Sequence, residues 1–171
     1  ILNHDTVSYG YLYNKEITSK DDAIADFTTR FNLDYITDTL YFDNYVAKNF
    51  KVGERTILQG NMYGFIEPLE ATSLGLYQSV CRQAWDCIFG IRSEDYCNSK
   101  MRTIMKETET FLIWLYRYGS KFDTPFWNYA KSLPFNPDKR FYEVTNGNLD
   151  EEYGQWEYWN FENWKKGVQY V

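Results

Sequence analysis

The sequence predicts a mixed α+β chain in which short strands near the start are followed by helices. Residues 35–60 mix Tyr, Phe, Val and Ile with turn residues, a composition typical of short strands. From residue 72 to residue 118, apolar residues recur at spacings of three and four, which is typical of amphipathic helices. With 171 residues and 44% hydrophobic content, the chain can bury one core.

The first part of the chain is expected to hold one helix and a few strands. Ser19 followed three residues later by Asp22 is a variant of the capping box, and an apolar stripe continues to about residue 32. Residues 35–60 should form two or three strands with a turn at 52–54. The run 55–60 is the strand expected to lead into the next loop.

The rest of the chain should be mainly helical. One helix is expected from about residue 72 to residue 89, and a longer one from about residue 96 to residue 118. Pro125 is placed to begin a short helix, because its missing N–H is not needed in a first turn. Pro134 and Pro137 then break the chain. From residue 150 onward the sequence is very aromatic and only weakly periodic.

Composition excludes several classes of function. A net charge of −6 and a pI near 4.9 argue against nucleic acid, which is bound mainly by Lys and Arg. No apolar run is long enough for a membrane span, and no secretory signal is visible. Cys81, Cys87 and Cys97 lack metal-ligand spacing and are expected to be reduced thiols in a cytoplasmic protein. With His4 as the sole histidine, no metal site is expected.

Four short segments carry a family resemblance. Residues 64–73 read Gly-Phe-Ile-Glu-Pro-Leu-Glu-Ala-Thr-Ser, and residues 123–127 read Asp-Thr-Pro-Phe-Trp. Upstream, residues 10–13 read Gly-Tyr-Leu-Tyr, and residues 22–27 read Asp-Ala-Ile-Ala-Asp-Phe. In this order the segments resemble the flavin-dependent halogenases, in particular the tryptophan-halogenase family. The resemblance implies a flavin-monooxygenase-like, two-part α/β fold, of which this chain is the α+β C-terminal part.

The segment 64–73 also has a chemical interpretation. A halide ion needs hydrogen-bond donors and positive potential, and both are found at the start of a helix. If the helix begins near Thr72, the hydroxyl of Thr72 and the backbone amides of Thr72 and Ser73 can converge on one anion. The same donors suit the edge of a reduced flavin on which negative charge accumulates. We therefore assign halide contacts to Thr72 and Ser73, and flavin contacts to Pro68, Thr72, Ser73 and Leu74.

The resemblance further implies a reaction and a catalytic residue. In the family, a separate flavin reductase supplies reduced FAD, which reacts with oxygen and halide to give hypohalous acid. The hypohalous acid then reaches a lysine and a glutamate that lie beside the aromatic substrate. The glutamate corresponds to Glu70, whereas Glu67 is open to a structural role. Ala71 stands where a serine is common, and Ser73 replaces a glycine of some members. Both differences are small for contacts made through the backbone.

Substrate contacts are assigned to the aromatic C-terminal segment. Trp156, Trp159 and Trp164 are candidates to stack on an aromatic ring, although each suits the closing of a core equally well. Tryptophan-specific members place a Phe-Trp pair in this region, where this chain has Asn163 and Trp164. That difference weakens the case for free tryptophan as the substrate.

The resemblance also defines what is expected outside these residues. The family's Gly-rich FAD motif, catalytic lysine and W-x-W-x-I-P segment all precede residue 10, so we expect the C-terminal portion of a longer protein. Residues 1–95 would end the flavin and substrate sheet region, and residues 96–171 would form a helical substrate-side region. Expected partners are the N-terminal part of the same protein, a transient flavin reductase and a small aromatic substrate; a homodimer is compatible with the sequence.

Two other functions remain open at this point. A related flavin monooxygenase would use the same cofactor without halide, although the E-P-L-E-A-T run argues against it. A non-enzymatic, aromatic-rich ligand-binding module, such as a carbohydrate-binding domain, would also suit the many Trp and Tyr side chains.

Overall fold

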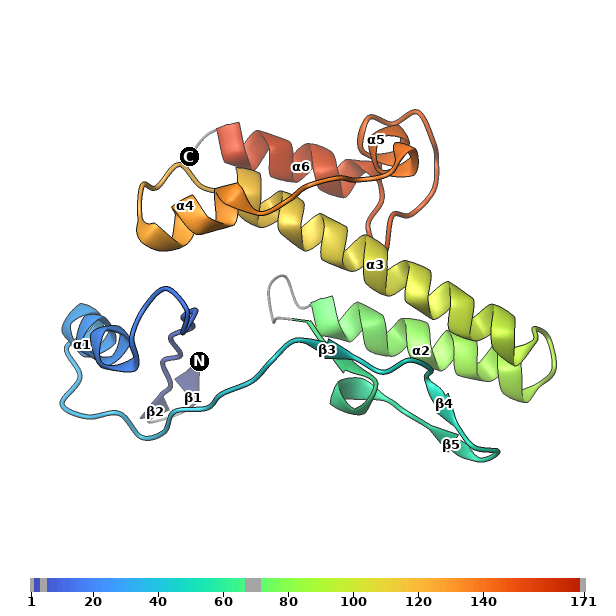
Figure 1. Ribbon diagram of the computed structural model, residues 1–171, viewed down its shortest axis with the longest axis horizontal. Helices are drawn as coiled ribbons and strands as arrows, with labels where there is room; N and C mark the ends of the chain where they lie inside the picture. The colour runs from blue at the N-terminus through green and yellow to red at the C-terminus, as the bar shows by residue number, and fades with distance from the viewer. Residues whose placement is uncertain (1, 4–5, 67–71, 170–171) are drawn as a thin grey trace.

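The computed structural model describes residues 2–3, 6–66 and 72–169 and confirms the α+β class (Figure 1). Short antiparallel strand pairs precede a mainly helical region that holds most of the core. The elements, in order, are β1 (Leu2–Asn3), β2 (Thr6–Val7), α1 (Lys20–Phe31), β3 (Tyr45–Val46), β4 (Lys51–Val52), β5 (Thr56–Ile57), the 3₁₀ turn η1 (Gly60–Met62), β6 (Gly64–Phe65), α2 (Thr72–Ile88), α3 (Glu94–Tyr118), α4 (Pro125–Ser132), α5 (Lys139–Thr145) and α6 (Tyr158–Gln169).

Helix α1 begins where the capping box predicts. The Ser19 hydroxyl accepts a hydrogen bond from the Asp22 backbone N–H at 3.1 Å and donates one to the Asp22 carboxylate at 2.7 Å. The helix ends at Asn32, whose φ of 50° is left-handed, as is common at helix C-termini. Two local signals thus determine both ends of this helix.

The strands are shorter than expected, and one of them leads elsewhere. The turn at 52–54 is confirmed, because β4 and β5 pair across Gly53, whose φ is +61°. The expected strand 55–60 spans only Thr56–Ile57, since Gly60 has a φ of +60° and begins the 3₁₀ turn. Instead, the first two residues of the family's signature segment, 64–73, form a strand themselves: β6 pairs with β3 and places Val46 opposite Gly64.

Helices α2 and α3 form a hairpin that contains much of the core (Figure 1). Gly90, with a φ of +67°, follows α2 in the connecting loop. Helix α3 starts two residues earlier than the periodicity indicates, because the Ser93 hydroxyl accepts a hydrogen bond from the Tyr96 N–H. The buried stripe of α3 includes Met101, Ile104, Met105, Thr108 and Leu112, spaced three and four residues apart.

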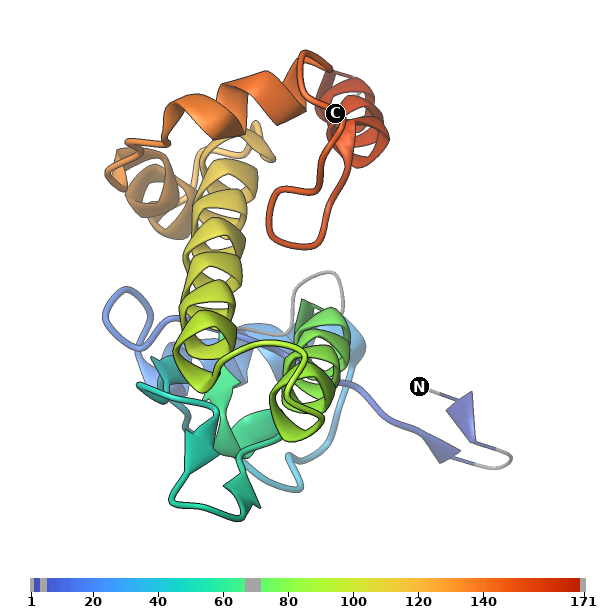
Figure 2. The same ribbon diagram turned by 90° about the vertical axis from the view of Figure 1, so that its right-hand side faces the viewer.

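The second half of α3 supports the three remaining helices (Figure 2). Thr124 caps α4 by accepting a hydrogen bond from the Trp127 N–H, and Pro125 occupies the first turn as expected. Helix α5 is an element that the periodicity does not indicate, and Asp138 caps it through the Phe141 N–H at 3.0 Å. Buried aromatic side chains of α3, α5 and α6 then meet in one cluster: Phe111, Phe141 and Phe161.

Candidate functional site at the start of helix α2

The signature segment runs from β6 to the first turn of α2. Ile66, its third residue, is 9% exposed and is the last one described before residue 72. Pro68 and Glu70, together with Glu67, lie outside the described residues. The described part of the candidate site is therefore the beginning of α2.

Thr72 is the first residue of α2, as the sequence predicts, and it is only 2% exposed. Ser73 is half-buried, whereas Leu74 is 70% exposed and lies on the outer side of the helix. The first four N–H groups of an α-helix have no acceptor within the helix, and the helix dipole makes this end positive. The beginning of α2, at Thr72 and Ser73, therefore has the backbone donors and the positive potential that favour an anion.

A side chain from a distant loop lies against this first turn. The Gln155 Nε2 donates a hydrogen bond to the Thr72 carbonyl oxygen at 3.3 Å. Gly75 gives Gln155 the space that it occupies, because a Cβ atom at residue 75 would lie 1.6 Å from Gln155 Oε1. The start of α2 is therefore packed against the loop that precedes α6.

That loop is a tight turn fixed on α3. Tyr153 and Trp156 exchange backbone hydrogen bonds of 2.8 and 3.1 Å, and Gly154 between them has a φ of +66°. The Gly154 N–H donates a buried hydrogen bond of 2.7 Å to Glu107 Oε2. A Cβ atom at residue 154 would lie 3.3 Å from the backbone nitrogen of Thr108, so glycine serves both the backbone angle and the close approach.

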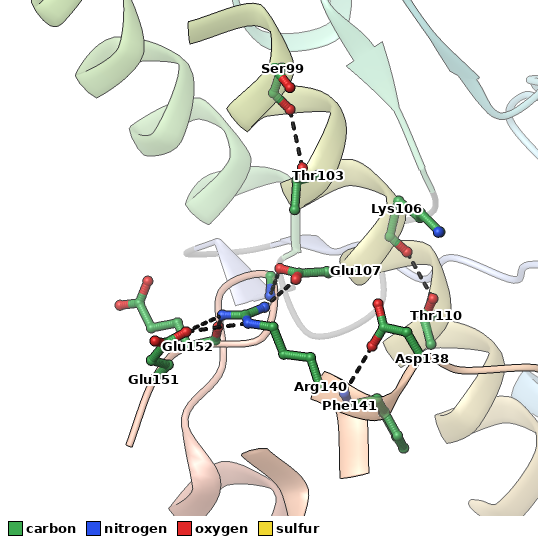
Figure 3. Close-up of polar contacts among 11 residues, drawn as sticks. Ser99, Thr103, Lys106, Glu107, Thr110, Asp138, Arg140, Phe141, Glu151 and Glu152 are labelled. Atoms are coloured by element: carbon green, nitrogen blue, oxygen red, sulfur yellow. Dashed lines mark hydrogen bonds and ion pairs between the residues drawn. The ribbon is translucent and has the colours of Figure 1, made fainter. Parts of the chain in front are cut away.

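The charge of Glu107 is balanced by an arginine from α5 (Figure 3). The Arg140 Nη1 pairs with Glu107 Oε1, and the Arg140 Nη2 lies 3.0 Å from Glu151 Oε2 and also donates to the Glu152 carbonyl. Glu107 is 5% exposed, so its pairing with Arg140 is what makes a buried carboxylate acceptable. This cluster joins α3, α5 and the loop that carries Gln155.

The three candidate tryptophans occupy two different environments. Trp156 is 8% exposed and packs on Phe111 with a ring-centroid distance of 3.7 Å. Trp164 packs on the same phenylalanine at 4.6 Å. Trp159 is 57% exposed, and its indole Nε1 donates to the Glu157 carboxylate at 2.5 Å. The structure thus brings Trp156 and Trp164 together, with Trp156 in the core and Trp164 partly buried against it, and leaves Trp159 at the surface.

Comparison with known families now adds to this geometry. The family model described as tryptophan halogenase matches residues 1–168, nearly the whole chain. The chain belongs to the tryptophan halogenase family. The resemblance found in its short motifs is thereby confirmed.

Two relatives in the tryptophan halogenase family show how much of the protein this chain represents. Tryptophan 7-halogenase KtzQ from Kutzneria sp. (strain 744) is 30% identical over 138 residues, which cover 74% of this chain and 25% of the relative. Tryptophan 7-halogenase RebH from Lentzea aerocolonigenes is 26% identical over 188 residues, which cover 91% of this chain and 33% of the relative. The chain therefore spans about a quarter to a third of the length of these halogenases.

Two of the halogenase motifs line one cavity of about 1140 Å³. Its lining includes the Gly-Tyr-Leu-Tyr stretch, residues 10–13, together with Phe126 and Trp127. Ile66, which directly precedes the signature carboxylates in sequence, also lines it. Segments far apart in the chain are thus brought together by the fold.

Other kinds of site receive no support from the described residues. Among them, no group of His, Cys, Asp and Glu side chains is arranged to hold a metal ion. Cys81, Cys87 and Cys97 are free thiols. Within the same part of the chain, no helix combines the length and apolarity that a membrane span requires.

The contacts around Gln155 are those that sequence reasoning missed. Glu107 follows Ile104 by three residues and precedes Phe111 by four, so it falls within the buried stripe of α3. An acidic residue at such a position signals a buried partner, because an unpaired buried carboxylate is strongly unfavourable. That signal identifies Glu107, but it does not reveal Gly154 or Gln155.

Tyr153 at the base of the turn leads to a prediction about alkaline pH. It is 1% exposed, and burial raises its pKa to about 12, although a hydrogen bond with Thr110 opposes the shift. Because the folded state holds the phenolic proton more tightly, its contribution to stability is complete below pH 10 and is lost as the pH rises toward 12. The free energy of unfolding should fall by up to about 2–3 kcal/mol over this interval.

Urea titrations between pH 9 and pH 12 measure this loss in the full-length protein. Tyr153→Phe should flatten the pH dependence, whereas Tyr35→Phe, at a residue that is 73% exposed, should leave it unchanged. An equal pH dependence in wild type and Tyr153→Phe would contradict the assignment.

Proposed function

We propose that this chain is the C-terminal part of a flavin-dependent halogenase that acts on an electron-rich aromatic substrate in the cytoplasm. The start of α2 supports the proposal, because Thr72 begins a helix with its side chain buried directly after the family's signature carboxylates. Residues 1–95 would then belong to the flavin and substrate region, and residues 96–171 to the helical region that supports it.

Halide and cofactor would meet at this helix start. Reduced FAD, delivered by a separate reductase, would supply with oxygen the two-electron oxidation of the halide. Thr72 and Ser73 would hold the halide through backbone N–H groups and the Thr72 hydroxyl. Those two residues, with Pro68 and Leu74, would lie along the flavin. The buried setting of Thr72 limits access of water, which protects a reactive halogen species from hydrolysis.

Substrate chemistry is assigned to Glu70 and to the aromatic C-terminal segment. Glu70 would stabilise positive charge on the ring under attack or accept its proton. Trp159 is the exposed member of the three candidate tryptophans, so it is the one that can stack on a ligand without leaving the core. Trp156 and Trp164 would shape the site through the loop and helix that they anchor on Phe111.

The full-length protein, supplied with reduced FAD, oxygen and chloride or bromide, tests the function directly. Indoles, phenols and pyrroles serve as candidate substrates, and mass spectrometry detects the isotope pattern of the incorporated halogen. Halogenated product that depends on both halide and reduced flavin is expected. A hydroxylated product that forms without halide would instead indicate the flavin monooxygenase alternative.

Thr72→Val tests the halide site. Valine keeps the shape of threonine but removes the hydroxyl, so one donor to the anion is lost while the backbone amides remain. Because a hydrogen bond to a charged group contributes about 1.5–3 kcal/mol, halide affinity should fall roughly 10- to 100-fold. Flavin oxidation with release of peroxide should continue. Steady-state kinetics with varied halide measure the effect.

Thr103→Val is the matched control, because it makes the same chemical change on a neighbouring helix. Thr103 lies on α3 and is exposed, and its hydroxyl donates to the Ser99 carbonyl of its own helix at 3.2 Å. Removal of that hydroxyl should leave the halide KM unchanged. An unchanged halide KM in Thr72→Val as well would show that the Thr72 hydroxyl is not a halide ligand.

The outer face of α2 supports the proposal that the N-terminal part of the protein packs here. Leu74, Trp85 and Ile88 are 70%, 60% and 66% exposed and lie along one side of the helix. Trp85 also stacks on exposed Phe89 with a centroid distance of 4.3 Å. An apolar stripe of this kind is unfavourable in water unless another surface covers it.

Residues 1–171 expressed alone should therefore lack a well-packed native state. We expect a broad thermal transition and binding of a hydrophobic dye, because the face that the N-terminal part covers would be exposed. The control is the same measurement on the full-length protein. A sharp, cooperative transition of residues 1–171 without dye binding would contradict this expectation.

A further inference from the structure

The loop between α5 and α6 extends to the start of α2 (Figure 2). Its residue Gln155 is half-buried and donates a hydrogen bond to the Thr72 carbonyl at 3.3 Å. That carbonyl belongs to the same residue whose hydroxyl and amide are assigned to the halide. Gln155 thus contacts the candidate site through the Thr72 backbone carbonyl, and not through the groups that are assigned to the halide.

Gly75 is explained by this contact. Its φ does not lie in the left-handed region, so the backbone angle does not require glycine. Glycine within a helix is otherwise unfavourable relative to alanine. A Cβ atom at residue 75 would lie 1.6 Å from Gln155 Oε1 and 2.7 Å from its Cδ. Gly75 therefore leaves room for the Gln155 side chain.

The backbone next to Gln155 is fixed by hydrogen bonds. The adjacent Gly154 N–H is bonded to buried Glu107 of α3 at 2.7 Å, and Glu107 pairs with Arg140 of α5 (Figure 3). A side chain that projects from such a turn can fix the position of whatever it contacts.

We infer that Gln155 is a positioning residue, which holds the first turn of α2 so that Thr72 and Ser73 present their donors to the halide. This inference rests on the proposed function. Gln155 does not touch the reacting atoms; it acts through the helix start. Loss of its contact should lower the affinity for halide and leave the rate of halogenation at saturating halide nearly unchanged.

The first part of the test uses kinetics of the full-length protein. Gln155→Ala should raise the halide KM about fivefold, the effect of losing one ordinary hydrogen bond, with kcat at saturating halide within about twofold of wild type. Gly75→Ala should raise the halide KM similarly, because the new methyl group displaces Gln155. The double variant should be no worse than either single variant. Additive effects would overturn the inference.

The second part uses thermal unfolding and needs no activity. Gly75→Ala should raise Tm less when Gln155 is present than in the Gln155→Ala background, because displacing Gln155 offsets part of the helix propensity that alanine adds. An equal rise in both backgrounds would show that Gln155 does not occupy this space and would overturn the inference. So would an unchanged halide KM in Gln155→Ala.

Failure of the proposed function can be told apart from failure of this inference. A wild-type protein that makes no halogenated product refutes the proposed function. A smaller Tm gain from Gly75→Ala when Gln155 is present, together with faster amide hydrogen exchange at residues 72–76 in Gln155→Ala, would still support the structural role of Gln155. Halogenation by wild type with no change in the halide KM of Gln155→Ala refutes the inference alone.

Discussion

Replacing Arg140 with methionine should lower the free energy of unfolding by about 3 kcal/mol. The substitution leaves Glu107, which is 5% exposed, without its cationic partner, while the methionine still fills part of the space. An unpaired buried carboxylate is more costly than the pair is favourable, so the loss comes mainly from the residue left behind. A larger loss is not expected, because the Arg140 side chain is 30% exposed and water can reach the site that it vacates.

Lys139→Met is the matched control, one residue away on the same helix. Lys139 also forms an ion pair, with Glu143 at 2.6 Å, but its side chain is 87% exposed. A surface pair of this kind contributes little, because water and salt screen the two charges. Urea denaturation of the full-length variants should therefore separate Arg140 from Lys139, and equal losses would show that Glu107 does not need its partner.

A double variant identifies the cause of the loss. Glu107→Gln removes the buried charge but keeps an oxygen that can accept the Gly154 N–H. Combined with Arg140→Met, it should be less destabilising than Arg140→Met alone, because no unpaired charge remains. A double variant that is less stable than either single variant would contradict this explanation.

Glu70→Gln should slow halogenation in the full-length protein by roughly two to four orders of magnitude, as is typical when a general base is lost. Glutamine keeps the size and hydrogen bonding of the side chain but cannot stabilise a cationic ring or accept its proton. The expectation rests on the proposed function. Single-turnover halogenation, started from enzyme with halide and substrate bound, measures the chemical step without product release.

Glu67→Gln is the comparison for that variant, because it removes a carboxylate three residues earlier in the same segment. If Glu67 is structural, its substitution should lower Tm or flavin affinity and leave the rate of the chemical step nearly unchanged. Equal losses of turnover and of Tm from both substitutions would show that the two carboxylates are assigned wrongly.

The sequence predicts the elements whose signals are local. Ser19 and Thr124 each accept the backbone N–H of the residue three positions later, and both helices begin where those residues indicate. The apolar spacing of α3 predicts the face that it buries. The spacing of Leu74, Cys81 and Ile88 on α2 does not, because these residues are exposed and α2 buries Leu76, Val80 and Ala84 instead. The strand expected at 55–60 is wrong in its extent, because Gly60 adopts a positive φ that composition alone does not reveal.

The candidate site could be predicted only in part. Its helix start follows from the motif, but the residues that support it are distant in sequence: Gly154 is 47 positions from Glu107, and Gln155 is 83 from Thr72. No periodicity or spacing connects such pairs. Helix α5 is not predicted for a different reason. Pro137 indicates a break in the chain, but the helix begins only two residues after it.

The fit between Gly75 and Gln155 has a consequence for directed evolution of this protein. In libraries that vary residue 75 alone, any larger side chain must displace the Gln155 amide group, so these variants should lose its contact with the start of α2. Libraries that vary residues 75 and 155 together would recover pairs in which a larger residue on the helix is matched by a smaller one on the loop. Among homologues, the same exchange of volume should emerge as covariation between two alignment columns that lie far apart.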